Sequence, residues 1–223
     1  MLKDFLLGDH EERPWYAHDL DLADYHFCTG RWAQEAKEFD KAIDELQAAL
    51  RYCDGVMMGT PSDPRAHPNP PDVVAIVRAY RRYSGCVTQK ADVLFNKHNI
   101  ERTVTSLISH LDIKESVAKI ANDGFDSAQT GLEHGRDKPE CYDNMRALVY
   151  NALLSLGYQR LALGAPLPIS LCSKYTQLSK DLQKYDIGER DWDELRTKEY
   201  GYYLIEEDIA ERAWLKNGLN NED

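Results

Sequence analysis

A stripe of mostly apolar residues, spaced alternately by three and four positions, restricts the fold of this chain more than any other feature. It runs through Leu22, Tyr25, Thr29, Trp32, Ala36, Phe39, Ile43, Leu46, Leu50 and Cys53. This spacing places side chains on one side of an α-helix, and charged residues fill the other positions over 35–45. The pattern predicts one long helix over residues 22–53, with Gly30 as the place where it would bend.

A break in the helical pattern follows over residues 54–72, which contain five prolines and two glycines. Proline lacks the N–H that helices and central strands need, so this stretch is predicted to be a long loop. Helical spacing returns after it, with Asp72 as the expected N-cap and a stripe of Val73, Val77, Tyr80, Ser84, Val87, Ala91, Leu94 and His98. The two long stripes are predicted to pack antiparallel, joined by the loop.

The second half of the chain continues this helical pattern. Residues 99–135 are expected to form one bent helix or two shorter ones, with a stripe of Val117, Ala121, Gly124, Ala128 and Leu132. The small residues on that stripe would allow another helix to approach closely. Further helices are predicted over 139–163, with Met145, Val149, Ala152 and Leu156 inward, then over 171–185 and 191–214.

These patterns together define the expected fold class, because no alternating strand of useful length occurs. The chain is predicted to be all-α, a single-domain bundle of about six to seven amphipathic helices. Residues 1–20 would form an N-terminal segment, 21–217 the bundle and 218–223 a frayed tail.

The charge and cysteine content exclude several classes of function. The 38 acidic and 27 basic side chains give a net charge of −11, which argues against a general grip on nucleic acid and against a polybasic membrane surface. It favours a basic partner. The five cysteines show no CxxC or zinc-type spacing, so they are expected to be free thiols. With no secretory signal or apolar span, a cytoplasmic location is expected.

Two patterns point toward enzymes, and each has a structural alternative. Glu35 and Glu38 lie one helical turn apart and Asp92 follows on the next long helix, an arrangement that could hold magnesium in a nucleotide hydrolase. The alternative is a solvated acidic face. Arg13 and His18 have a spacing found in some helical ribonucleases, and His18 with Asp19 resembles a metal phosphohydrolase dyad. The alternative there is a flexible N-terminal segment, and no cofactor is predicted.

A third pattern faintly resembles a helix-turn-helix. It covers Ser106 to Asp123, with Leu111, Asp112 and Ile113 as the turn. An ordinary helix corner is the alternative.

Three arginines form the most suggestive polar cluster. Arg78, Arg81 and Arg82 lie on one helical face, with Tyr83 beside them. In an acidic protein such a cluster either pairs with internal carboxylates, for which the stretch 35–45 is available, or holds an anion or a partner.

The tyrosines lead to the main functional hypothesis. Thirteen tyrosines and four tryptophans exceed what the inward stripes need, and Tyr200 and Tyr203 lie on different sides of the last predicted helix. Tyrosine and tryptophan are favoured at protein interfaces. We therefore expect a non-enzymatic protein of the inhibitor, immunity or adaptor type, which binds another protein through Arg78, Arg81, Arg82, Tyr83, Tyr200 and Tyr203. The hydrolase or ribonuclease and the DNA-binding regulator are the alternatives.

Overall fold

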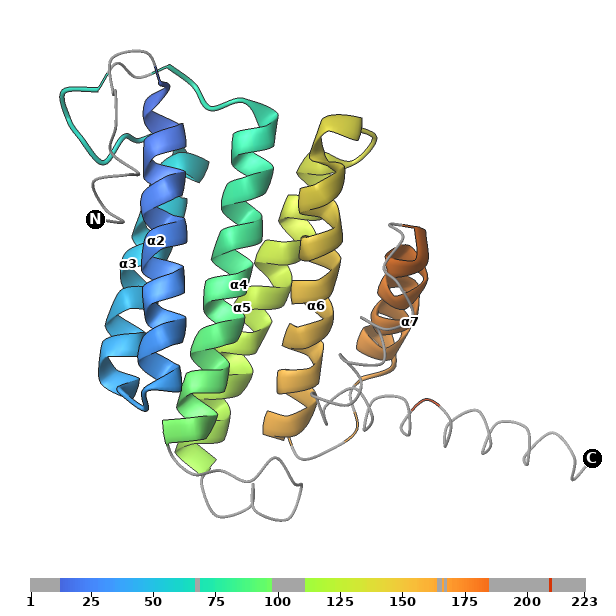
Figure 1. The fold of residues 1–223 in the computed structure, drawn as a ribbon. Helices are drawn as coiled ribbons and strands as arrows, with labels where there is room; N and C mark the ends of the chain where they lie inside the picture. Colours follow the sequence, from blue (N-terminus) through green and yellow to red (C-terminus); the bar gives the residue numbers. More distant parts are fainter. Residues whose placement is uncertain are drawn as a thin grey trace, which may run out of the picture.

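The computed structural model describes residues 13–66, 69–97, 111–163, 166, 168–184 and 209. These residues form helices and loops without any strand, which confirms the all-α class (Figure 1). The helices are α2 (Trp15–Glu35), α3 (Phe39–Met58), α4 (Val73–Lys97), α5 (Leu111–Gly135), the 3-10 helix η2 (Pro139–Cys141), α6 (Tyr142–Leu163) and α7 (Ile169–Lys184).

Successive helices run up and down, so each is antiparallel to the next (Figure 1). Helix α4 is central, because α2, α3, α5 and α6 all contact it. Helix α7 packs on α6 at the far side of the bundle.

The expectation of one helix over residues 22–53 is wrong, because the chain turns back between α2 and α3. Glu38 N–H donates to the Ala33 carbonyl at 2.8 Å and Lys37 N–H donates to the Gln34 carbonyl at 2.9 Å. These two bonds form a Schellman motif, which needs a left-handed residue, and Lys37 has a φ of 62°. The turn carries no glycine or proline, and the apolar spacing continues through it, so no sequence pattern indicates it.

Gly30 serves close packing within this hairpin. A Cβ added there would lie 3.1 Å from Leu46 Cγ of α3. The glycine therefore lets α2 and α3 approach closely, where the sequence suggested a bend.

The proline loop is shorter than predicted, because α3 continues to Met58 and ends at Gly59, whose φ is 68°. Residues 54–58 are therefore helical. The loop is tied to α2 at two points. Buried Asp19 accepts hydrogen bonds from the backbone and the hydroxyl of Ser62, and the Trp15 indole donates to the Asn69 carbonyl at 2.7 Å.

The predicted N-cap of α4 is confirmed. Asp72 Oδ1 accepts a hydrogen bond from Ala75 N–H at 2.7 Å. This bond satisfies one of the backbone donors that the first turn of a helix leaves unpaired.

The small residues of α5 lie where two other helices come closest. A Cβ on Gly124 would lie 2.8 Å from Ser155 Oγ of α6, and one on Gly131 would lie 2.7 Å from Tyr80 Cβ of α4. The predicted close approach at this stripe is confirmed. Residues 99–110, the other part of this predicted helical region, lie outside the described residues.

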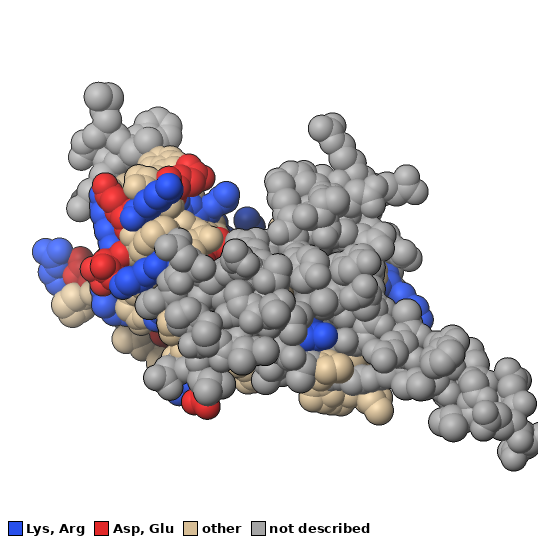
Figure 2. Space-filling model, turned by 90° about the horizontal axis from the view of Figure 1, so that it is seen from below, with Lys and Arg blue, Asp and Glu red and all other residues tan. Residues whose placement is uncertain are grey.

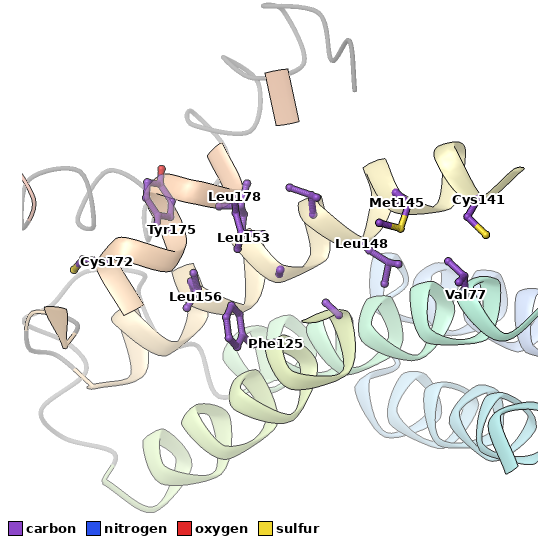
Figure 3. Close-up of a cluster of buried hydrophobic side chains, with 13 residues drawn as sticks. Val77, Phe125, Cys141, Met145, Leu148, Leu153, Leu156, Cys172, Tyr175 and Leu178 are labelled. Atoms are coloured by element: carbon purple, nitrogen blue, oxygen red, sulfur yellow. The ribbon is translucent and has the colours of Figure 1, made fainter. Parts of the chain in front are cut away.

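The main apolar core lies between α4, α5, α6 and α7 (Figure 3). It includes the four residues predicted to face inward on α6, and α7 adds Tyr175 and Leu178. Of the last predicted helix only Ile209 is described, as a helical residue partly buried against this core. The domain limits 1–20, 21–217 and 218–223 therefore stay a prediction.

The cysteines are thiols, as the sequence predicts, and most of them are buried. None of the five cysteines forms a disulfide, and Cys28 alone among them is exposed. Burial raises the pKa of the Cys86 thiol to about 12, so it stays protonated at neutral pH.

The turn between α2 and α3 gives the first testable prediction. Lys37→Gly should raise the free energy of unfolding by up to about 1 kcal/mol, because glycine adopts a positive φ without steric cost. Arg51→Gly is the control, since Arg51 is exposed within α3, and it should lower stability by about 1 kcal/mol. Urea unfolding measures the stability of both variants. Equal destabilisation by the two would contradict the left-handed conformation of Lys37.

The helix contacts of α5 give a second prediction from a matched pair of glycines. Gly131→Ala should destabilise the protein by about 1–3 kcal/mol, since its Cβ would meet backbone-linked Tyr80 Cβ at 2.7 Å. Gly85→Ala should stabilise it by about 0.5–1 kcal/mol, because alanine is the better helix former. The nearest atom there is at 3.5 Å, an ordinary contact. Thermal unfolding of both variants checks the sign, and a stabilised Gly131→Ala would refute the close approach.

Candidate functional site

Two arginines of the predicted cluster pair with carboxylates inside the bundle. Arg78 donates to Asp24 at 2.7 Å and to Asp21 at 3.2 Å. Arg82 donates through Nε to Asp24, and its guanidinium lies 4.2 Å from the centre of the Phe27 ring. The internal pairing that the sequence left open is therefore found for these two. Their partners lie on α2, earlier in the chain than the acidic stretch that the sequence suggested.

Arg81 differs from its two neighbours. It donates to Asn144 Oδ1 at 3.1 Å and makes no ion pair with any described residue. Burial, followed by the charge of Arg82, lowers the pKa of Arg81. Burial acts on Arg78 in the same direction, but Asp24 and then Asp21 outweigh it and raise the pKa of Arg78. The three arginines are therefore not one equivalent anion site.

The predicted interface tyrosines are largely outside what the structure describes. Tyr200 and Tyr203 are not among the described residues. Tyr83 is partly buried against the core between α3 and α4, and burial raises its pKa. The exposed tyrosines that the structure does describe are Tyr142 and Tyr150, which are 51% and 38% exposed on α6.

A polar seam joins α4 to α6 through the middle of the bundle. Its hydrogen bonds span 2.9–3.2 Å and pair Arg81 with Asn144, Ser84 with Asn151, Thr88 with Ser155, and Asp92 with Tyr158. The residue numbers rise together on both helices, so α4 and α6 run parallel, as Figure 1 shows. The sequence pattern does not indicate this seam, because Ser84 has the spacing of an apolar stripe.

The seam ends in a polar pocket at the turn of the α2–α3 hairpin, which we call the hairpin pocket. Its volume is about 550 Å³ and it is lined by Arg31, Gln34, Glu35, Lys37, Phe39, Gln89, Asp92 and Asn96. Asp92 accepts hydrogen bonds from Gln34 at 2.5 Å, from Tyr158 at 2.9 Å and from Asn96 at 3.2 Å. Figure 2 views this end of the bundle, where acidic and basic side chains are interspersed.

The three predicted magnesium ligands are not brought together. Glu35 and Asp92 both line the hairpin pocket, but Glu38 does not and instead pairs with Lys41 at 2.8 Å. The described ranges contain no group of three or more His, Cys, Asp or Glu side chains placed to hold a metal ion.

The described residues of the other predicted motifs lie in structural contacts or within a continuous helix. Arg13 pairs with Asp21 at 2.8 Å just before α2, and Asp19, beside His18, holds the proline loop. Residues 111–113 lie in the first turn of the continuous helix α5, so the predicted turn of a helix-turn-helix is wrong. Residues 106–110 lie outside the described part.

A second depression, the α5–α7 groove, lies on the opposite half of the bundle over α6. Its volume is about 680 Å³. Its floor is apolar, made by Leu132, Met145, Val149 and Leu178, and the last three are buried. Exposed Tyr142 stands at its edge. Its rim carries three basic and three acidic side chains, Arg136, Lys138, Lys174, Glu133, Asp137 and Asp181.

Comparison with known proteins adds no relative. No family model, curated protein or solved structure matches this chain. No helix within the described ranges is long and apolar enough to cross a membrane.

The arginine pairs give a third prediction. Asp24→Asn should destabilise the protein by about 1–3 kcal/mol, because it leaves the partly buried Arg82 without a carboxylate and Arg78 with Asp21 alone. Asp63→Asn is the matched control, since Asp63 also pairs with an arginine, Arg65 at 2.8 Å, but at the surface. It should change stability by less than about 0.5 kcal/mol. Urea unfolding measures both, and equal effects would contradict a structural role for Asp24.

Proposed function

We propose that this chain is a protein-binding protein that receives a helix of its partner in the α5–α7 groove. One observation carries the proposal, the apolar floor of the groove beside exposed Tyr142. An apolar groove edged by an aromatic side chain is a common seat for an amphipathic helix.

The dimensions of the groove support this occupant. Its two walls run from Gln129 to Gly135 on α5 and from Lys174 to Asp181 on α7. Each wall spans about two helical turns, or about 10 Å. A partner helix would therefore place apolar residues at positions i, i+3 or i+4, and i+7 on the floor, with polar residues toward both walls.

The charges suggest how such a partner is recognised. Because the rim balances three basic against three acidic groups, it favours a partner helix that carries both signs. The net charge of −11 acts over a longer range and favours association with a protein of net positive charge. An inhibitor, an immunity protein or an adaptor would act in this way, without catalysis of its own.

A crosslinking experiment tests this proposal. A photoreactive phenylalanine in place of Tyr142 should crosslink one partner from the native cell, because this side chain stands at the edge of the groove. The matched control carries the same group in place of Tyr150, which is exposed on the same helix but does not line the groove. Mass spectrometry of the crosslinked peptide should identify an amphipathic helix.

A second variant checks that the partner binds in the groove itself. Leu132→Glu places a charge on the floor at a partly buried position and should abolish capture of the same partner. Circular dichroism confirms that the variant is folded. Equal crosslinking from positions 142 and 150, or capture unchanged by Leu132→Glu, would refute the proposal.

A further inference from the structure

The hairpin pocket is independent of the α5–α7 groove, because the two share no lining residue. It is formed by the end of α2, the turn into α3 and one face of α4. Its volume of about 550 Å³ lies within the common range of small-ligand sites, about 300–1,000 Å³.

The floor of this pocket presents amide groups with spare hydrogen-bonding capacity. Gln89 donates one side-chain N–H to Gln34 Oε1, and Asn96 donates one side-chain N–H to Asp92. A primary amide has two N–H donors and a carbonyl acceptor. Gln89 and Asn96 therefore each keep an N–H and a carbonyl oxygen that no described residue uses. Such paired donor and acceptor edges match the hydrogen-bonding edge of a nucleobase.

The mouth of the pocket carries two basic side chains and an aromatic ring. Arg31 and Lys37 are exposed and make no ion pair within the described part of the chain. Other cations nearby do have partners, since Lys41 pairs with Glu38 and Lys97 with Asp40. Two unpaired cations at the mouth of a polar pocket suit a phosphate group.

Two further side chains complete the mouth. Phe39 is partly buried and offers a ring against which a planar group can stack. Glu35 is exposed and makes no ion pair with any described residue, and Asp92 also lines the pocket. Both carboxylates oppose an anion there and limit its affinity.

We infer that the hairpin pocket binds a nucleotide. The amide side chains of Gln34, Gln89 and Asn96 contact the edge of the base, and Phe39 packs on its face. Arg31 and Lys37 hold the phosphate. This site binds a small molecule independently of the partner proposed for the groove.

Titration calorimetry of the full chain in magnesium-free buffer tests this inference. The probes are AMP, GMP, CMP and UMP, each compared with its nucleoside and with inorganic phosphate. At least one nucleotide should bind with a Kd below about 1 mM, and this Kd should be lower than that of its nucleoside or of inorganic phosphate. The double variant Arg31→Gln, Lys37→Gln should weaken nucleotide binding by about tenfold or more, while binding of the nucleoside is unchanged.

Three further variants separate base recognition from general attraction of anions. Gln89→Ala should weaken both nucleotide and nucleoside binding, whereas Glu35→Gln should strengthen nucleotide binding by about two- to fivefold. Arg51→Gln, which removes an exposed charge of α3 outside the pocket, should change neither. Absence of nucleotide binding, phosphate binding as tight as that of the nucleotide, or affinities unaffected by the pocket variants would overturn the inference. None of these variants alters the groove, so the two proposals fail separately.

Discussion

Helix α4 is contacted by the four α-helices α2, α3, α5 and α6, and each of its faces has to match a different neighbour. Toward α2 it presents Arg78 and Arg82, whose charges are balanced by Asp21 and Asp24. Toward α5 it lies so close that Tyr80 leaves no room for a Cβ at Gly131. A helix enclosed in this way cannot rotate or slide without loss of several contacts at once, because packed interiors have few voids.

The polar seam between α4 and α6 restricts these two helices to one register. An apolar interface tolerates some sliding, because most apolar contacts are interchangeable. A buried hydroxyl or amide has to meet its own partner, and leaving one unpaired costs about 1–3 kcal/mol. The pairs Ser84 with Asn151 and Thr88 with Ser155 therefore fix the register of two parallel helices that are not consecutive in the chain.

The basic side chains include two kinds, those paired with carboxylates inside the bundle and those that line a pocket. The arginines most noticeable in the sequence, Arg78 and Arg82, are bound to carboxylates of α2. Arg31 and Lys37 belong to no motif of the sequence, yet they line the mouth of a pocket and form no ion pair with any described residue. Clustered charges on one helical face are close to each other, and a fold commonly neutralises them. Isolated charges beside a cavity are the better candidates for binding a ligand.

The sequence by itself determined the features that depend on neighbouring residues. The spacing of apolar side chains defined α4 and α6 closely, Asp72 marked the start of α4, and Gly124 marked a close helix contact. Each of these follows from the geometry of one helix and its nearest turn. The apolar spacing did not predict the turn at Lys37, because the same stripe suits one long helix and two helices that fold back on each other.

Only the tertiary structure decided which distant side chains meet. Gln34 and Gln89 lie 55 positions apart, and Ser84 and Asn151 lie 67 apart. Their pairing depends on how two helices are rotated and shifted against each other. That arrangement follows from the summed packing of the whole bundle, and no short stretch of sequence encodes it.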